Sequence, residues 1–308
     1  MNSYFFKRIF ALIPVLIGVS LITFSLMYFV PGDVVTDIVG ERASEEIRQK
    51  AIEELGLDKP FHEQYLMYMK RLVRGDLGKS YINNKSVAES IRERFPITLK
   101  LALMSFIIST VIGLTFGIIA AVKQNSAIDR IVRSITLLGV SMPVIFFGLL
   151  MMYIFGVWLK ILPVSGIGDG SLKYYILPSI VLGLSSAAYQ ARLTRSCMLE
   201  VIRQDYIRTA KSKGLSQKII IYKHALRNAA IPIVTDLIMS IGFLLTGSVL
   251  TESIFELPGI GSFTVNAVMR REIPVAMGCF IFQSFIFVFF NLLVDIAYGI
   301  INPRIRFN

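Results

Sequence analysis

Residues 193–228 read LTRSCMLEVIRQDYIRTAKSKGLSQKIIIYKHALRN, and they form the one long polar interruption in the apolar second half of the chain. Their only acidic residues are Glu200 and Asp205. Their basic residues are Arg195, Arg203, Arg208, Lys211, Lys213, Lys218, Lys223 and Arg227. Apolar segments long enough to cross a bilayer lie on both sides, and lysine and arginine keep such loops in the cytoplasm. The pattern therefore predicts a cytoplasmic loop between two membrane spans.

The loop has its own local pattern. A helix is expected over Val201–Lys213, with a break at Gly214 and a short second helix that Ser216 can cap. The second helix has the apolar residues 219–222 in a basic surrounding. Apolar side chains on a cytoplasmic helix need a surface that buries them, and either the lipid surface or a partner protein can provide it.

Composition places the chain in the membrane. Hydrophobic residues make up 54% and charged residues 17%, and the mean hydropathy is +0.64, all far from a soluble average. We therefore predict an all-α integral membrane protein with six transmembrane helices, each of about 20 residues. The predicted spans are Ile9–Val30, Ile97–Val122, Ser134–Val157, Tyr174–Ala191, Ala229–Leu250 and Val275–Ile301. A kink is expected at Pro143 in the third span.

The net charge of +11 is explained by the orientation of the chain in the membrane. If the N-terminus is cytoplasmic, six spans return the C-terminus to the cytoplasm, and the whole positive excess falls on that side. This is the distribution that membrane topology requires. A nucleic-acid ligand is therefore not expected, and the chain is predicted to be a multi-pass membrane protein with both termini in the cytoplasm.

The predicted organisation has three parts. Residues 1–30 contain the tail and an uncleaved first span, because residues 30–33 offer no small-x-small cleavage site. Residues 31–96 form an extracytoplasmic insert, mostly helical, with amphipathic segments at Glu45–Gly56 and His62–Leu72. Residues 97–308 form the core membrane domain with five spans. The small core of the insert is predicted to consist of Leu66, Met69, Leu72 and Val73.

Three pairs of residues, two glycines, two cysteines and two aspartates, give weaker evidence about packing or function. Gly113 and Gly117 form a small-xxx-small pair that suits close contact between helices. Cys197 and Cys279 fall on opposite sides of the membrane and lack metal-ligand spacing, which argues against a disulfide or a metal site. Asp236 and Asp295 lie near the cytoplasmic ends of spans, where a structural ion pair with Arg227 or Arg304 is favoured over a functional role.

The segment 252–276 is more specific than a linker. It is unusually long for a plain connection, and Phe255 and Phe263 flank a tight turn made by one proline and two glycines. A turn near the mouth of a passage fits this pattern. The candidate gate residues are Glu252, Phe255, Pro258, Gly259 and Gly261.

Several motifs in order carry a family resemblance. The chain contains RIFALIPVLIGVSLITF, LGLDKPFHEQY, RGDLGKS, FPITLKLAL, RTAKSKGL, HALRNAAIP and LTESIFELPGIG. Together they resemble the membrane-spanning permease subunits of ABC importers in the dipeptide/oligopeptide/nickel family. The resemblance implies a type I importer permease fold and a location in a bacterial or archaeal cell membrane. It also implies four partners: a second homologous permease, two cytoplasmic ATP-binding subunits and an extracytoplasmic solute-binding protein.

The same resemblance identifies residues 193–228 as the ATPase-coupling loop. Aligned on Gly214, the loop lacks the glutamate and the proline of the general ABC-importer pattern, while HALRN is similar to the peptide/nickel branch. This departure puts in doubt any contact that the missing glutamate would make. The implied coupling residues are Arg208, Thr209, Ala210, Gly214, Leu215, Ser216, Ile219, Tyr222 and His224.

Energy for transport must come from outside this chain, because the sequence contains no nucleotide-binding motif. The chain is thus expected to be non-catalytic and to bind no cofactor, with ATP and magnesium used by the partner subunits. Di- or oligopeptides are the preferred cargo, and nickel or another metal chelate is the alternative. An ion-coupled carrier is disfavoured because the two halves are unlike. A membrane hydrolase is disfavoured because the two histidines fall on opposite sides.

Overall fold

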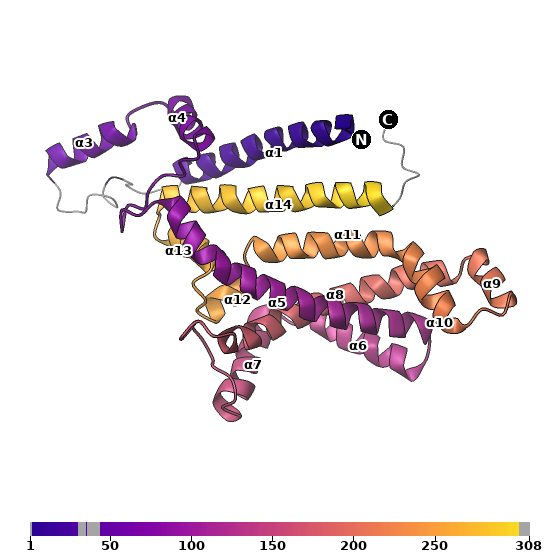
Figure 1. The fold of residues 1–308 in the computed structure, drawn as a ribbon. Coiled ribbons are helices and arrows are strands. Elements are labelled where there is room, and N and C mark those ends of the chain that lie inside the picture. Colours follow the sequence, from indigo (N-terminus) through magenta and orange to yellow (C-terminus); the bar gives the residue numbers. More distant parts are fainter. Residues whose placement is uncertain (1, 30–34, 36–43, 302–308) are drawn as a thin grey trace.

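The computed structural model describes residues 2–29, 35 and 44–301, which form helices joined by turns and loops (Figure 1). The insert and first half contain α1 (Asn2–Phe29), α3 (Glu45–Leu55), α4 (Phe61–Val73), α5 (Val87–Val122), α6 (Ala127–Ser141), α7 (Val144–Met151) and the π-helix η1 (Met152–Trp158). The second half contains α8 (Lys173–Ile202), α9 (Asp205–Ser212), α10 (Gln217–Ile219), the π-helix η2 (Ile220–Ala225), α11 (Leu226–Leu245), α12 (Val249–Ile254), α13 (Ile260–Met269) and α14 (Ile273–Ile301).

The most extensive helix pair is α5 against α8, and the predicted glycine pair makes it possible. A Cβ on Gly113 would come within 2.7 Å of the Gln190 Cβ, and one on Gly117 within 2.6 Å of the Thr194 Cβ. Both distances are shorter than real Cβ contacts, so only glycine permits this approach. The expectation of a close helix contact is confirmed.

Different helices form the two ends of the bundle (Figure 1). The insert helices α3 and α4 lie at the same end as α12 and α13, while α9 and α10 lie at the opposite end. The start of α1 and the end of α14 lie at the end of α9 and α10, and α1 packs along α14. The two segments singled out from the sequence, residues 193–228 and 252–276, are therefore at opposite ends of the bundle.

Pro143 does more than kink the predicted third span. The helix axis turns by 103° between α6 and the α7–η1 segment, because proline lacks an N–H and cannot follow residues in an α-helix without strain. The predicted kink at Pro143 is therefore confirmed, and it is sharp enough that the segment Ser134–Val157 is either a broken span or a re-entrant one.

The number of spans stays a prediction. Among the described residues, three helices are long and apolar enough to cross a membrane, and a fourth is added if the bent pair counts as one. The three are Val87–Val122, Gln217–Ile254 and Ile273–Ala297. The helix α5 begins ten residues before Ile97, the predicted start of the second span. The helix α8 is long, but it is not apolar enough to count as a span by composition. The described part of α1 contributes a shorter apolar stretch, Ile13–Leu26.

The insert is helical where expected, but its packing differs from the prediction. Of the four predicted core residues, Met69 and Leu72 are partly buried and pack against the cluster that contains Tyr68, whereas Leu66 and Val73 are 55% and 82% exposed and form no core. Instead Tyr68 and Gln64 are buried, and Tyr68 stacks on Phe24 of α1 with ring centroids 5.9 Å apart. The buried face of α4 is thus turned toward α1, and the aromatic residues decide the orientation. Residues 31–34 and 36–43 of the predicted insert lie outside the described residues, as do Val30 of the predicted first span and Arg304.

Candidate coupling segment and outer turn

Residues 193–228, the predicted coupling loop, are called the coupling segment below, and they do not form the single helix that was predicted over Val201–Lys213. The span helix α8 continues to Ile202, Arg203 and Gln204 break the helix, and α9 begins at Asp205. The helix α9 then ends at Ser212, two residues before Gly214, whose φ of +75° places it in the left-handed region. Glycine adopts this conformation at low cost and commonly ends helices in this way, so the predicted break is confirmed.

The second predicted helix is not short. Ser216 occupies the N-cap position, yet its side chain makes no capping hydrogen bond. From Gln217 the chain runs through α10 and η2 into α11, so the coupling segment passes directly into the following membrane helix up to Leu245. The predicted boundary at Asn228 therefore lies inside one continuous helical segment.

The coupling segment has two faces. Its inner face packs against the ends of α5 and α8, and Ile207, Ala210 and Ile220 are buried there beside Met198. Its outer face is formed by residues that the rest of the described chain leaves uncovered. Leu215, Ile219 and Tyr222 are exposed to 38%, 43% and 61% respectively. Arg208, Thr209, Gly214 and Ser216 are exposed as well, and His224 is half-buried.

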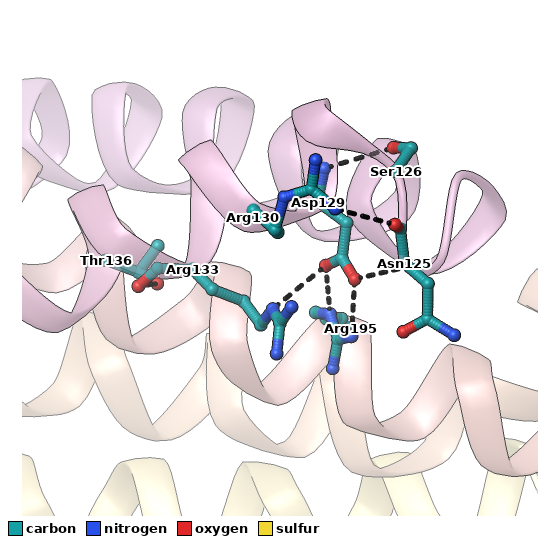
Figure 2. Close-up of polar contacts among 7 residues, drawn as sticks. All are labelled: Asn125, Ser126, Asp129, Arg130, Arg133, Thr136 and Arg195. Carbon is teal, nitrogen blue, oxygen red and sulfur yellow. Dashed lines mark hydrogen bonds and ion pairs between the residues drawn. The ribbon is translucent and has the colours of Figure 1, made fainter.

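Next to this segment lies a buried carboxylate that the sequence analysis missed (Figure 2). Asp129, near the start of α6, is fully buried. The Arg195 guanidinium of α8 donates from Nε to Asp129 Oδ1 at 2.7 Å and from Nη2 to Oδ2 at 2.9 Å. The Arg133 Nε lies 3.5 Å from Oδ1, and the Asn125 backbone N–H donates to Oδ2 at 2.9 Å.

This arrangement fixes the α5–α6 turn to α8. Two parallel hydrogen bonds from an arginine fork hold a carboxylate in one geometry, and the remaining acceptor sites of Asp129 are filled by Arg133 and Asn125. Ser126 accepts a hydrogen bond from the Asp129 N–H at 3.3 Å and so caps α6. The Ser-x-x-Asp spacing was a readable signal for the helix start, but nothing local pointed to Arg195.

At the opposite end, the outer turn is organised around Glu252. This residue of α12 is fully buried. Its Oε1 accepts from the Thr98 hydroxyl of α5 at 2.8 Å, and its Oε2 accepts from the Ser262 N–H at 3.0 Å. The Thr98 hydroxyl oxygen in turn accepts from the Ile260 N–H at 2.9 Å. Glu252 was predicted as a gate residue, and the structure places it inside the packing as the anchor of the turn.

The glycines of the turn make room for this carboxylate. A Cβ on Gly259 would lie 2.5 Å from the Glu252 carboxyl carbon, and one on Gly261 would lie 3.0 Å from its Oε2. Neither glycine has a positive φ, so close approach rather than backbone conformation requires them. Phe255 is 1% exposed, and the Pro258 carbonyl accepts from Arg94 Nη1 at 3.4 Å. The candidate gate residues are thus brought together against α5.

The two intramembrane aspartates do not form the predicted arrangement. Among the described residues, Asp236 has no ion pair with Arg227 or with any other residue, so the expected structural pair at Asp236 is wrong. Asp295 has an interaction within the chain, and Arg304 lies outside the described residues. Within the described residues, no three His, Cys, Asp or Glu side chains are grouped so that they could hold a metal ion.

Comparison with known proteins assigns the chain to a family. Residues 113–307 match the binding-protein-dependent transport system inner membrane component, and residues 1–102 match the N-terminal part of the same transport components. The chain belongs to this transport permease family. The family resemblance inferred from the sequence motifs is therefore confirmed.

Named relatives of this permease extend over its full length. It is 40% identical to the di/tripeptide transport system permease of Pseudomonas aeruginosa strain UCBPP-PA14, over 99% of both chains. It is 41% identical to the dipeptide transport permease of Alkalihalophilus pseudofirmus, over 100% of both. It is 40% identical to the glutathione transport system permease of Escherichia coli O6:H1, over 100% of both.

A solved structure supports the fold of the permease. The inward-facing methionine ABC transporter MetNI matches with a TM-score of 0.55 at 17% sequence identity, covering 69% of this chain and 96% of that chain. At this identity the match shows the fold alone. The predicted all-α fold of a type I ABC importer permease is confirmed.

Proposed function

We propose that this permease is the membrane-spanning subunit of an ATP-driven ABC importer of di- and oligopeptides. The full-length similarity to permeases named for di/tripeptide and dipeptide transport carries the proposal. The chain is the non-catalytic subunit and forms the passage with a second homologous permease. Two cytoplasmic ATP-binding subunits use ATP and magnesium, and an extracytoplasmic binding protein delivers the cargo.

The exposed face of the coupling segment supports its role in docking. A surface with Leu215, Ile219 and Tyr222 uncovered requires an apolar partner, and each such side chain contributes roughly 1.5–3 kcal/mol when fully buried. The lipid surface attracts the basic residues at about 1 kcal/mol each. It gives no reason for the sharp turn at Gly214 that separates α9 from α10. A groove on an ATP-binding subunit fits both features.

The orientation follows from the same segment. With residues 193–228 in the cytoplasm, the start of α1 and the end of α14 are cytoplasmic too, because they lie at the same end of the bundle (Figure 1). The insert and the outer turn then face the outside. The protein is a multi-pass component of the cell membrane.

Site-directed cross-linking in native membranes tests the coupling role. A cysteine replaces Ile219 in a background with Cys197→Ala and Cys279→Ala, and Lys79→Cys on the insert loop serves as the matched control. We expect cross-links from position 219 to an ATP-binding subunit, changed by added nucleotide, and none from position 79. Labelling of position 219 by lipid-phase probes alone would contradict the importer assignment.

Glutathione, a tripeptide, is a second candidate cargo because a glutathione permease is similar over the whole chain. Competition separates the candidates. ATP-dependent uptake of a radiolabelled dipeptide into proteoliposomes with all partner subunits should be inhibited by excess unlabelled dipeptide. Inhibition by glutathione alone would favour the second cargo. Inhibition by a nickel chelate alone would favour the metal alternative.

A further inference from the structure

Two charged side chains inside the long helices of the bundle have no ion-pair partner in the described part of the chain. Asp236 belongs to the run Gln217–Ile254, which is long and apolar enough to cross a membrane. Arg192 lies in α8, ten residues before its end at Ile202. Neither side chain forms an ion pair with a described residue. Charged residues within membrane helices are costly, and those that are kept commonly mark the path of an ion or a substrate.

A hydrogen bond between α8 and α11 relates the heights of these two charges in the bundle. The Gln190 side chain of α8 donates from Nε2 to the Ser240 hydroxyl oxygen of α11 at 3.4 Å. The helix α8 runs toward the coupling segment, and α11 runs away from it (Figure 1). Arg192 is two residues from Gln190, and Asp236 is four residues from Ser240, both on the side of the coupling segment. At 1.5 Å per residue, the two charges differ in height by only about 3 Å.

Both side chains are accessible in the described chain. Arg192 is exposed, and its guanidinium carbon lies 5.9 Å from the ring centroid of Tyr189, which is itself 48% exposed. Asp236 is half-buried, and its charge acts on the Cys197 thiol of α8. The Asp236 carboxylate therefore lies on the side of α11 that faces α8, and a molecule beside these two helices can reach both charges.

The exposed face of α8 around Arg192 is polar. Tyr189, Arg192, Ser196 and Glu200 follow one another at intervals of three or four residues, and all four are exposed. This spacing places them along one face of the helix. These residues contribute to the composition that keeps α8 from counting as an apolar span. A polar and charged face on a helix of a membrane bundle suits contact with a water-filled passage rather than with lipid chains.

We propose that Arg192 and Asp236 bind the two ends of a short peptide in the passage. Asp236 holds the terminal ammonium group, and Arg192 holds the terminal carboxylate. The planar fork of arginine matches a carboxylate, and a carboxylate accepts hydrogen bonds from an ammonium group. Opposite charges at nearly one height, neither of them neutralised within the described chain, complement a zwitterion. This subsite rests on the peptide-importer function proposed above, and it recognises free termini rather than particular side chains.

Photolabelling of the membrane complex in lipid nanodiscs tests the two charges separately. The complex contains both permeases and the ATP-binding subunits, and the binding protein is left out so that its own selectivity does not enter. The probes are alanyl-benzoylphenylalanine, its N-acetyl derivative, which lacks the ammonium group, and its C-terminal amide, which lacks the carboxylate. We expect the unblocked dipeptide to label α8 or α11 at concentrations about 10- to 100-fold lower than either blocked probe requires. Equal labelling by the three probes would overturn the proposal, and so would an absence of labelling.

Substitutions assign each terminus to one residue. Asp236→Asn should weaken labelling by the unblocked dipeptide and by the amide about tenfold, and leave the N-acetyl probe unchanged because that probe has no ammonium group. Arg192→Gln should weaken labelling by the unblocked dipeptide and by the N-acetyl probe, and leave the amide unchanged. Glu63→Gln and Lys70→Gln, which change exposed charges on α4, are the matched controls and should alter none of the three. Equal weakening of all three probes by Asp236→Asn or Arg192→Gln would overturn the proposal, because it would indicate a structural effect.

An ion pair with the second permease is the competing use of these charges, and stability distinguishes it from cargo binding. We expect Asp236→Asn to leave the Tm of the peptide-free complex unchanged, because the carboxylate has no partner in the described chain. A lower Tm or separation of the two permeases would overturn the proposal. ATP-dependent peptide uptake by the unmodified complete transporter is measured separately. Uptake without labelling that depends on the termini refutes this subsite alone, whereas the absence of uptake refutes the transport assignment.

Discussion

Arg195 of α8 holds Asp129 of α6 through two hydrogen bonds of 2.7 and 2.9 Å, although 66 residues separate them in the chain (Figure 2). The carboxylate is fully buried, while the arginine side chain is 19% exposed. The pair fixes the turn between α5 and α6 to the helix that leads into the coupling segment. Burial makes this pair sensitive to the loss of either member.

Asp129→Asn should lower the free energy of unfolding by about 3 kcal/mol, at the low end of the range for breaking a buried ion pair. The amide removes the charge that compensates Arg195 and keeps a similar size. Unfolding in mixed micelles measures the change. Asp205→Asn is the control, because its pair with Arg208 at 3.6 Å is exposed and contributes little. Equal effects of the two variants would contradict the role assigned to Asp129.

Gly259→Ala should destabilise the outer turn by about 1–3 kcal/mol, the usual cost of overpacking. The added methyl group would lie 2.5 Å from the Glu252 carboxyl and force it away from Thr98. Gly18→Ala on α1 is the matched control, since nothing lies within 4 Å of its Cβ position. The same unfolding assay applies, and an unchanged stability of the Gly259 variant would refute the packing argument.

Thr98→Val should lower the free energy of unfolding by about 2 kcal/mol. The hydroxyl donates to Glu252 Oε1 and accepts from the Ile260 N–H. Its loss removes a donor from the buried Glu252 carboxylate and leaves the buried Ile260 N–H without a partner. Thr136→Val provides the comparison, because that hydroxyl donates to a carbonyl of its own helix, Arg133, at 3.1 Å. Its stability should change by less than about 0.5 kcal/mol.

Ile219→Ser should weaken binding to the ATP-binding subunits, whereas Ile220→Ser at the neighbouring position should lower the stability of the fold. Ile219 is 43% exposed and belongs to the proposed docking face, so its variant should keep the Tm and bind the ATP-binding subunits roughly tenfold more weakly. Ile220 is 4% exposed, and its variant should lose about 3 kcal/mol of stability. Thermal unfolding and pull-down titration separate the two effects. If Ile219→Ser binds the ATP-binding subunits as tightly as the unmodified protein, docking at this face is contradicted.

Local signals predicted the local features of this molecule. Gly214 marked the end of α9, because a left-handed residue after a helix favours glycine. The spacing of Gly113 and Gly117 predicted a close helix contact, since small residues on one face leave room for a partner. The membrane class and the permease fold followed from composition and ordered motifs.

Features that depend on distant residues could not be read in the same way. Asp129 and Arg195 are far apart in sequence, and each looks like an ordinary cytoplasmic charge. Glu252 looks like a polar residue of a surface turn until the Thr98 hydroxyl of α5 is placed beside it. In α4, helical periodicity alone favoured Leu66 and Val73 as core, whereas the aromatic contact of Tyr68 with Phe24 turns the other face inward.

The unbroken run from Gln217 to Leu245 has a mechanical consequence. At 1.5 Å per residue it is a rod roughly 43 Å long, with the proposed docking face at one end and the outer turn just beyond the other. A tilt of about 5° around the Gln217 end displaces Leu245 by about 4 Å, which is comparable to the width of a peptide backbone. The π-helical stretch at Ile220–Ala225, near the Gln217 end, interrupts the α-helical hydrogen-bond pattern, so we expect the rod to bend there. If an ATP-binding subunit docks at the Gln217 end as proposed, a small displacement there would be carried along the rod to the outer turn.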